Sequence, residues 1–436
     1  MNSIHLQTGK DWRSVLLAIA SIGGALMAAA LAVIVVVSQA AINFGSGPQN
    51  HPLLDTILLA SAILFVGALL IPAAYFSVRR LTGEQVTASP MKKMNIGAGL
   101  LVIAVWLGIV ALTQIFYGNS ILRWITPPFY VLSIGLPVYF FARLAIGGLN
   151  AGSKQRTWGA LGSGMILGPA LAMFIELTFV LILLIGAGVY LAFHPELRTV
   201  FNSIREQIGS TSNPDNVLNL ISPYLLNPVV IFMALLFFSV IGPVVEESAK
   251  SLTTWTIFDH LSSPAQGFVI GALSGTGFGL VESLLASVQP DSSWAVTLLV
   301  RGGTTMMHIV TAGLTGWGIA YFHVHKRAGW MVALYALAMF LHGVWNASVV
   351  VIVVGATHMA LGAQSTDVLG ILLMILGIAT LSIIALSIPI ALGVINWRLR
   401  ISSSSIKTTA APSIPTPITI EDAPRGDEEG KTNREG

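Results

Sequence analysis

The sequence has 436 residues, of which 54% are hydrophobic and only 9% are charged. Because soluble proteins carry about 25% charged residues, 22 basic and 19 acidic side chains are too few to cover a globule of this size in water. The composition excludes a soluble globular protein and indicates a membrane protein. The chain has no Cys, which excludes disulfides, thiolate nucleophiles and Cys-ligated metal centres.

The net charge is +3, and the basic residues are spread thinly between apolar segments. A protein that binds nucleic acid would gather such residues into a patch. We therefore expect no nucleic-acid partner and interpret the Lys and Arg residues as topology signals.

Ten apolar segments are long enough to cross about 30 Å of hydrocarbon as helices. They predict an all-α, polytopic membrane helix bundle with about ten transmembrane helices. The predicted spans are residues 14–39, 53–78, 95–117, 126–148, 159–192, 228–258, 267–288, 294–322, 329–357 and 368–396.

The loops between these spans differ in charge. Lys and Arg occur before the first span and after the second, fourth, eighth and tenth, whereas the loops 40–52, 289–293 and 358–367 contain neither. Basic residues favour the cytoplasmic side of a membrane, so we predict that both termini are cytoplasmic. The segment 193–221 mixes charges with Leu and Ile, which predicts an amphipathic helix on the outer face.

Three regions follow from these patterns. Residues 1–221 hold five spans and the outer amphipathic segment, and residues 222–400 hold the other five spans. Residues 401–436 are rich in Ser, Thr, Pro and charge, and cannot bury enough apolar surface to fold. We expect them to form a disordered cytoplasmic tail.

Ionisable residues within spans are costly and therefore mark functional candidates, and here they concentrate in the C-terminal half. In span six, Pro243 is predicted to kink or open the helix just before Glu246 and Glu247. Lys250 lies one turn beyond Glu246 on the same face. Two adjacent carboxylates in a low dielectric cannot both ionise cheaply, so the pattern is typical of an acid/base pair. A water-facing helix end with a lysine that reaches the interface is the alternative.

The next three spans each add polar residues. Span seven carries a small-residue stripe typical of close helix contact, followed by Glu282, which can simply pair with Arg301 of span eight. Span eight places His308 near its middle, and span nine places His342 and Asn346 on one face. Counted from the predicted span ends, Glu246, His308 and His342 share a layer near mid-membrane. Hydrogen bonds between helices are the alternative interpretation of these histidines.

These residues form a set of motifs in successive spans: Glu246-Glu247-x-x-Lys250, Gly-x-Gly-Phe278-x-x-x-Glu282, Arg301 with His308-x-x-Thr311, and His342-x-x-x-Asn346. Over residues 240–350 the set resembles the PrsW family of membrane proteases, distant relatives of the CAAX-processing and bacteriocin-processing membrane proteases. The residue after Glu282 is Ser283, where the family motif has Asn, and the first five spans have no counterpart in the resemblance.

The resemblance implies an intramembrane endopeptidase that cleaves a membrane-embedded or membrane-anchored protein substrate within the bilayer, with a prokaryotic cell membrane as the expected location. Carried onto this sequence, it implies that the catalytic residues are Glu246, Glu247, Lys250, Glu282, His308, His342 and Asn346.

Family members are usually described as metalloproteases, but two mechanisms stay open here. The chain has no His-Glu-x-x-His helix, which excludes a zincin site. Zinc can be held by His308, His342 and a carboxylate from Glu246, Glu247 or Glu282, and we take Glu282 as the predicted ligand. Alternatively, Glu246 or Glu247 deprotonates water directly, while the histidines and Asn346 orient the water and stabilise the oxyanion.

Glu, His and Lys at mid-membrane are also typical of proton relays, so a proton-coupled transporter is the alternative function. Such transporters often contain internal repeats with broken helices in both halves, whereas here the polar residues are confined to one half. A non-catalytic membrane scaffold is a third interpretation.

Overall fold

The computed structural model describes residues 11–46, 50–84, 86–87, 90–119, 121–210, 214–289, 293–361 and 367–409. Helices make up almost all of this part of the chain. They are α1 (Trp12–Ser46), α2 (Asn50–Leu81), α3 (Ile96–Gly118), η1 (Leu122–Ile125), α4 (Thr126–Ile146), α5 (Lys154–Phe193), α6 (Pro195–Ser210), α7 (Pro214–Leu225), α8 (Pro228–Leu236), η2 (Phe237–Ile241), α9 (Gly242–Trp255), η3 (Phe258–His260), α10 (Pro264–Ala286), α11 (Trp294–His325), α12 (Ala328–Leu361) and α13 (Val368–Thr409).

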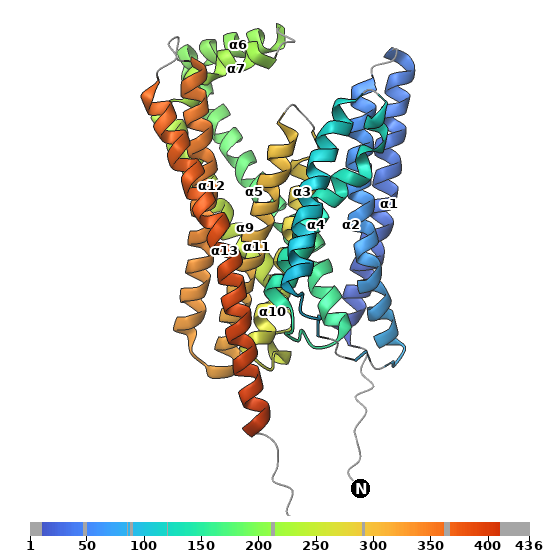
Figure 1. Cartoon of the computed structure of the whole chain (residues 1–436). Helices are drawn as coiled ribbons and strands as arrows, with labels where there is room; N and C mark the ends of the chain where they lie inside the picture. The colour runs from blue at the N-terminus through green and yellow to red at the C-terminus, as the bar shows by residue number, and fades with distance from the viewer. Residues whose placement is uncertain are drawn as a thin grey trace, which may run out of the picture.

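The long helices run up and down through one bundle (Figure 1). Nine helical segments of the described ranges are long and apolar enough to cross a membrane. The predicted span that this count leaves out corresponds to α11, which has 32 residues but carries many Gly, Thr and His residues. α1 begins and α13 ends at the same end of the bundle (Figure 1), the arrangement expected if α11 crosses it as well.

The predicted amphipathic segment forms α6 and α7. These helices lie across the end of the bundle opposite the first residue of α1 and the last residue of α13 (Figure 1). The sequence predicts a short amphipathic helix in this segment, and the structure confirms that the segment is helical. Which end faces the cytoplasm stays a prediction from the loop charges.

The C-terminal helix is longer than its apolar span. α13 continues to Thr409, past the boundary predicted at residue 400, because the chain has no Pro or Gly there and Pro412 is the next residue that cannot continue a helix. Residues 410–436, the rest of the predicted tail, lie outside the described residues. The division into regions 1–221 and 222–400 stays a prediction.

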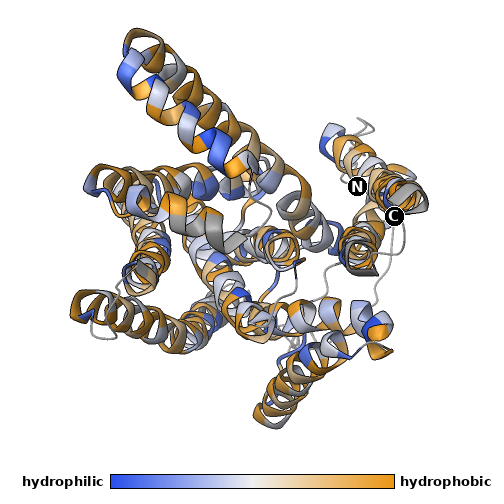
Figure 2. Ribbon diagram, turned by 90° about the horizontal axis from the view of Figure 1, so that it is seen from above, coloured by the Kyte–Doolittle hydropathy of each residue, from blue (hydrophilic) through white to orange (hydrophobic). Residues whose placement is uncertain are grey.

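Many large hydrophobic residues of the long helices are exposed, and hydrophobic residues run along most of these helices (Figure 2), which fits lipid as the surrounding medium. At the centre, α10 is buried along most of its length. It packs most extensively against α11 and also contacts α4, α5 and α9. Helices α4 and α5, from the first five spans, therefore pack against the same centre as the helices that carry the polar residues.

The small residues of α10 allow its backbone to touch that of α11. A Cβ atom placed on Gly271 would lie 2.0 Å from the carbonyl oxygen of Ala312, and one on Gly275 would lie 2.2 Å from that of His308. Only a residue without a side chain fits at such distances. The predicted close helix contact is confirmed, and it sets the depth and position of His308.

We expect Gly275→Ala to lower the free energy of unfolding by about 1–3 kcal/mol, since the added methyl group forces α10 and α11 apart. Thermal unfolding in detergent measures the change. Gly186→Ala in α5 is the control, because no heavy atom lies within 4 Å of the Cβ position there. Equal stability of the two variants would contradict the packing described.

Candidate functional site

A cavity of about 610 Å³ lies between α5, α8, α9, α10, α11 and α12. The predicted site residues that line it are Glu246, Glu282, His308, His342 and Asn346, together with Arg301. Glu247 and Lys250 lie fully buried behind its wall. The structure thus brings all the predicted catalytic residues together from four helices.

The helix of span six opens just before the acidic pair, one of the two outcomes predicted for Pro243. Residues of η2 form one turn of π-helix, and Pro243 follows at the start of α9. Pro243 has no N–H group to donate to the carbonyl oxygen of Ser239. That oxygen lies 2.4 Å from the position of a Cβ on Gly343 of α12, and Asn346 Nδ2 donates to the oxygen of Phe238 at 2.8 Å. Contacts with α12 therefore stabilise the π-helical turn and fix the direction in which the carboxylates of α9 point.

Glu247 is held by three donors on three helices. Its Oε1 atom accepts hydrogen bonds from Lys250 Nζ at 2.8 Å, His342 Nδ1 at 2.8 Å and Thr311 Oγ1 at 3.0 Å. Because the side chain of Glu247 is completely buried, this carboxylate cannot reach the cavity. It acts on neighbouring side chains by orienting them.

Lys250 is the cation at the centre of the site. Its Nζ atom lies 2.8 Å from Glu247 Oε1, 3.3 Å from Glu246 Oε2 and 2.8 Å from His308 Nδ1. The same ammonium group lies 4.4 Å from the centre of the Phe278 ring, a cation–π contact. A buried ammonium is stable only with such partners, so the pair of Glu247 and Lys250 depends on both residues.

These contacts fix the tautomer of each histidine. An ammonium group only donates, so His308 Nδ1 accepts from Lys250, and His308 Nε2 then donates to Glu282 Oε2 at 2.5 Å. His342 donates from Nδ1 to Glu247, which leaves a lone pair on Nε2. The two nitrogen atoms with lone pairs, His342 Nε2 and His308 Nδ1, lie 3.7 Å and 3.9 Å from Glu246 Oε2.

Glu282 has two partners, and one of them is the cation that the sequence suggested. Its Oε1 atom lies 2.8 Å from Arg301 Nη2, while its Oε2 atom accepts from His308. Ser283, the departure from the family motif, hydrogen-bonds Thr305 Oγ1 at 2.8 Å across the α10–α11 contact. Glu282 is therefore tied to Arg301 and to the outer nitrogen of His308.

Glu246, His308 and His342 form a group suited to a metal ion. One ligand atom from each residue lies within 4.8 Å of the others. Glu246 Oε2 is buried and makes no hydrogen bond with the described residues, and its nearest cation is Lys250 Nζ at 3.3 Å. Carboxylate oxygen and imidazole nitrogen are ligands that zinc accepts. In this geometry the carboxylate of the group comes from Glu246, whereas the sequence prediction took Glu282.

Glu176 was not predicted as a site residue. It lines the same cavity from α5, outside the four motif-bearing helices. The sequence contains one sign of its importance, because Glu176 is the single charged residue within predicted span five. Thr311 was part of the motif His308-x-x-Thr311 but received no role, because its bond to Glu247 depends on a helix rotation that spacing does not give.

Residues 213–381 match the family model described as PrsW family intramembrane metalloprotease. This region belongs to the PrsW family. The match confirms the resemblance and extends it from residues 240–350 to the segment between α7 and the middle of α13, so that all four motif-bearing helices lie inside the PrsW region. Helices α1–α6 lie outside it. No curated protein and no solved structure matches the chain.

We expect Lys250→Met to lower the free energy of unfolding by about 3–5 kcal/mol, because it leaves Glu247 charged, buried and unpaired. Chemical unfolding in detergent measures the loss. The double variant Glu247→Gln with Lys250→Met should recover part of it, since the unpaired charge is gone.

Lys92→Met serves as the control, because Lys92 is exposed. A double variant whose cost equals the sum of the two single costs would show that Glu247 and Lys250 do not stabilise each other.

Proposed function

We propose that this protein is an intramembrane protease that hydrolyses peptide bonds of membrane-embedded or membrane-anchored proteins in the cavity between α5 and α12. The observation that carries the proposal is the convergence of Glu246, His308 and His342 on one cavity within the bundle. The PrsW match supports an intramembrane metalloprotease in general. A prokaryotic cell membrane stays the predicted location of this integral membrane protein.

The shape of the cavity supports a membrane-embedded substrate. Beyond the polar residues its walls are apolar side chains of α8 and α12, including Ile231, Val350 and Val353. Leu225 of α7 and Thr357 of α12 also line the cavity, which therefore reaches toward the end of the bundle where α6 and α7 lie. An apolar segment fits these walls, while its scissile peptide group reaches the polar residues.

We assign Glu246 as the residue that activates water, because its carboxylate lines the cavity and Glu247 does not. In the metal-free version, Glu246 takes one proton from water, and the water oxygen bonds to the carbonyl carbon. The proton then passes to the nitrogen of the leaving amine as the C–N bond breaks. Asn346 lines the same cavity and is the candidate donor to the oxyanion.

The residues present fit a bound metal ion. Glu246, His308 and His342 would hold it, while Glu247 and Glu282 would orient the two imidazoles from behind, as carboxylates do for histidine ligands of zinc. Lys250 would have to release His308 Nδ1 and keep its contact with Glu247. When bound, a zinc ion would polarise water and the scissile carbonyl group. Zinc is therefore the proposed cofactor.

We expect Glu246→Gln to reduce cleavage by about 10²- to 10⁴-fold with stability near that of the wild type, since the amide cannot take a proton from water. Glu247→Gln should also reduce cleavage, but with a loss of stability, because Lys250 loses its charged partner. Single-span membrane proteins are co-expressed with each variant, and new termini are mapped by mass spectrometry.

Glu206→Gln on the exposed helix α6 is the matched control and should cleave normally. Full cleavage by the Glu246→Gln variant would rule out the assigned role.

We expect purified protein to contain about one equivalent of zinc, and His308→Ala and His342→Ala to lose it. Glu282→Gln should only weaken binding, by about 10- to 100-fold, because Glu282 orients His308 from behind. Elemental analysis and titration with chelators measure both effects.

Chelation should stop cleavage reversibly. Cleavage by protein that holds far less than one equivalent of metal would favour the metal-free mechanism and leave the protease proposal in place. If Glu282→Gln lost the metal and Glu246→Gln kept it, the ligands would instead be His308, His342 and Glu282, as predicted from the sequence.

A further inference from the structure

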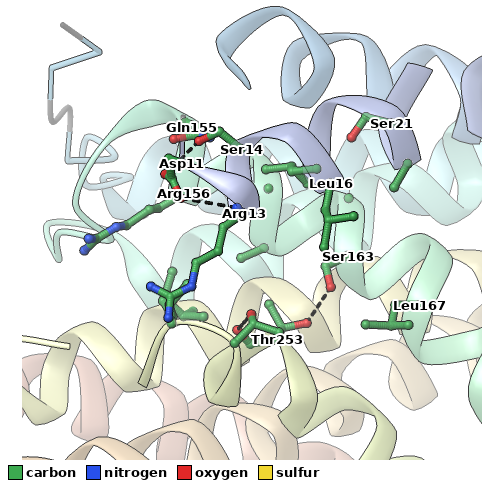
Figure 3. Close-up of a pocket in the computed structure, with 18 of the residues that line it drawn as sticks. Asp11, Arg13, Ser14, Leu16, Ser21, Gln155, Arg156, Ser163, Leu167 and Thr253 are labelled. Atoms are coloured by element: carbon green, nitrogen blue, oxygen red, sulfur yellow. Dashed lines mark hydrogen bonds between the residues drawn. The ribbon is translucent and has the colours of Figure 1, made fainter. Parts of the chain in front are cut away.

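A second cavity, of about 320 Å³, lies between α1, α5, α9 and α10 (Figure 3). It is found at the end of the bundle where α1 begins and α13 ends, away from α6 and α7. Its lining is charged at the mouth and apolar farther in. None of the residues assigned to proteolysis lines it.

Three arginines, Arg13, Arg80 and Arg156, gather at the mouth of this cavity. Arg80 Nη2 lies 3.4 Å from Asp11 Oδ2, so these two charges are paired. Arg13 Nη2 lies 3.8 Å from an oxygen of the exposed Asp259. Three guanidinium groups thus face two carboxylates, and a positive charge is left over.

The imidazole of His260, next to these arginines, adds no further positive charge. Burial, together with the nearby charges of Arg13 and Arg156, lowers the pKa of His260 from its ordinary value. A neutral His260 accepts a hydrogen bond from Arg13 Nη1 at 2.7 Å, and its backbone oxygen accepts from Arg156 Nη1 at 3.2 Å. These contacts hold the two guanidinium groups on one side of the mouth.

Arg13 and Arg156 both have N–H groups left to donate hydrogen bonds to a ligand. Arg13 Nε is buried and has no hydrogen-bond partner among the described residues. In the same part of the chain, Arg156 makes no ion pair with a carboxylate. Figure 3 shows the two guanidinium groups extending toward the side opposite Leu167. Guanidinium groups arranged in this way suit an anionic group such as a phosphate.

The inner lining has the length and character of one lipid chain. Leu16 and Ala20 of α1 and Leu167 of α5 form apolar walls. From Arg156 to Leu167 the helix rises by about 16 Å, close to the ~15 Å of one leaflet of hydrocarbon. Leu16 and Leu167 are exposed, so the cavity is open to the surrounding lipid as well as at its charged mouth.

We propose that this cavity binds one anionic lipid, with its headgroup between Arg13 and Arg156 and an acyl chain along Leu16, Ala20 and Leu167. A zwitterionic lipid would bring its own cation to a mouth that already has a positive excess. A free phosphate ion would leave the apolar walls unused. The inference is independent of the proposed proteolysis.

Native mass spectrometry of the full chain in detergent, with phosphatidylglycerol or phosphatidylcholine added, tests the proposal. We expect one phosphatidylglycerol to be retained in preference to phosphatidylcholine. Arg13→Gln with Arg156→Gln should weaken this binding about 30-fold, because each arginine contributes about 5-fold to the attraction of an anionic lipid. Arg198→Gln with Arg205→Gln, two exposed positions on α6, removes the same charge and should leave binding unchanged.

A second variant tests the acyl chain. Ala20→Phe fills the apolar part of the cavity from a position with an exposed side chain, so it should weaken binding of phosphatidylglycerol without unfolding the protein. Soluble glycerol phosphate, which has the headgroup but no chain, should not stabilise the wild type against heat as phosphatidylglycerol does.

Equal retention of the two lipids, or equal losses in the two double arginine variants, would overturn the proposal. Unchanged binding in Ala20→Phe, or glycerol phosphate as effective as the lipid, would instead show a site for the anion alone and would overturn it as well.

Discussion

The cost of burying charge in a membrane governs the site of this protein. An ammonium group or a carboxylate away from water costs several kcal/mol unless the two are paired and hydrogen-bonded. Lys250 and Glu247 meet that requirement at 2.8 Å, one helical turn apart on α9. Apart from Glu246, their remaining partners come from other helices, among them Thr311 of α11 and His342 of α12. The buried pair therefore holds α9, α11 and α12 in one relative position.

The same pairing decides what the histidines present to the cavity. Because Lys250 donates to one histidine and Glu247 accepts from the other, each imidazole has one tautomer. The lone pair of His308 Nδ1 accepts from Lys250 and that of His342 Nε2 stays free, and these two nitrogen atoms lie 3.9 Å and 3.7 Å from Glu246 Oε2. Charges that are fully buried thus orient side chains that line the cavity. The buried pair is a positioning device for the cavity in front of it.

Most of the helices, and the layer in which the polar residues lie, could be predicted because length, hydropathy and loop charge report on them directly. The sequence could not predict that Glu246 is the carboxylate grouped with His308 and His342, because the depth of a residue in the membrane says nothing about rotation around the helix axis. Glu246 and Glu247 are about 100° apart on α9, so one faces the cavity and the other the interior. The π-helical turn of η2 and Pro243 set that rotation. In the same way, spacing along α10 placed Glu282 at that layer or somewhat outside it and gave no sign that its carboxylate accepts from His308 Nε2.

The helices outside the family match also shape the site. Ser163 of α5 hydrogen-bonds Thr253 of α9 at 2.9 Å, and Thr253 bonds Ser274 of α10 at 3.1 Å. Ser274 Oγ donates to the backbone oxygen of Lys250 at 3.0 Å, so it accepts from Thr253, which in turn accepts from Ser163. This series of hydrogen bonds connects α5 to the backbone of α9 at Lys250. On the other side of α9, Glu176 of α5 lines the cavity with Glu246. A PrsW region without α5 would lose both the support behind Lys250 and one wall of the cavity, so the geometry of the site depends on a helix outside the family match.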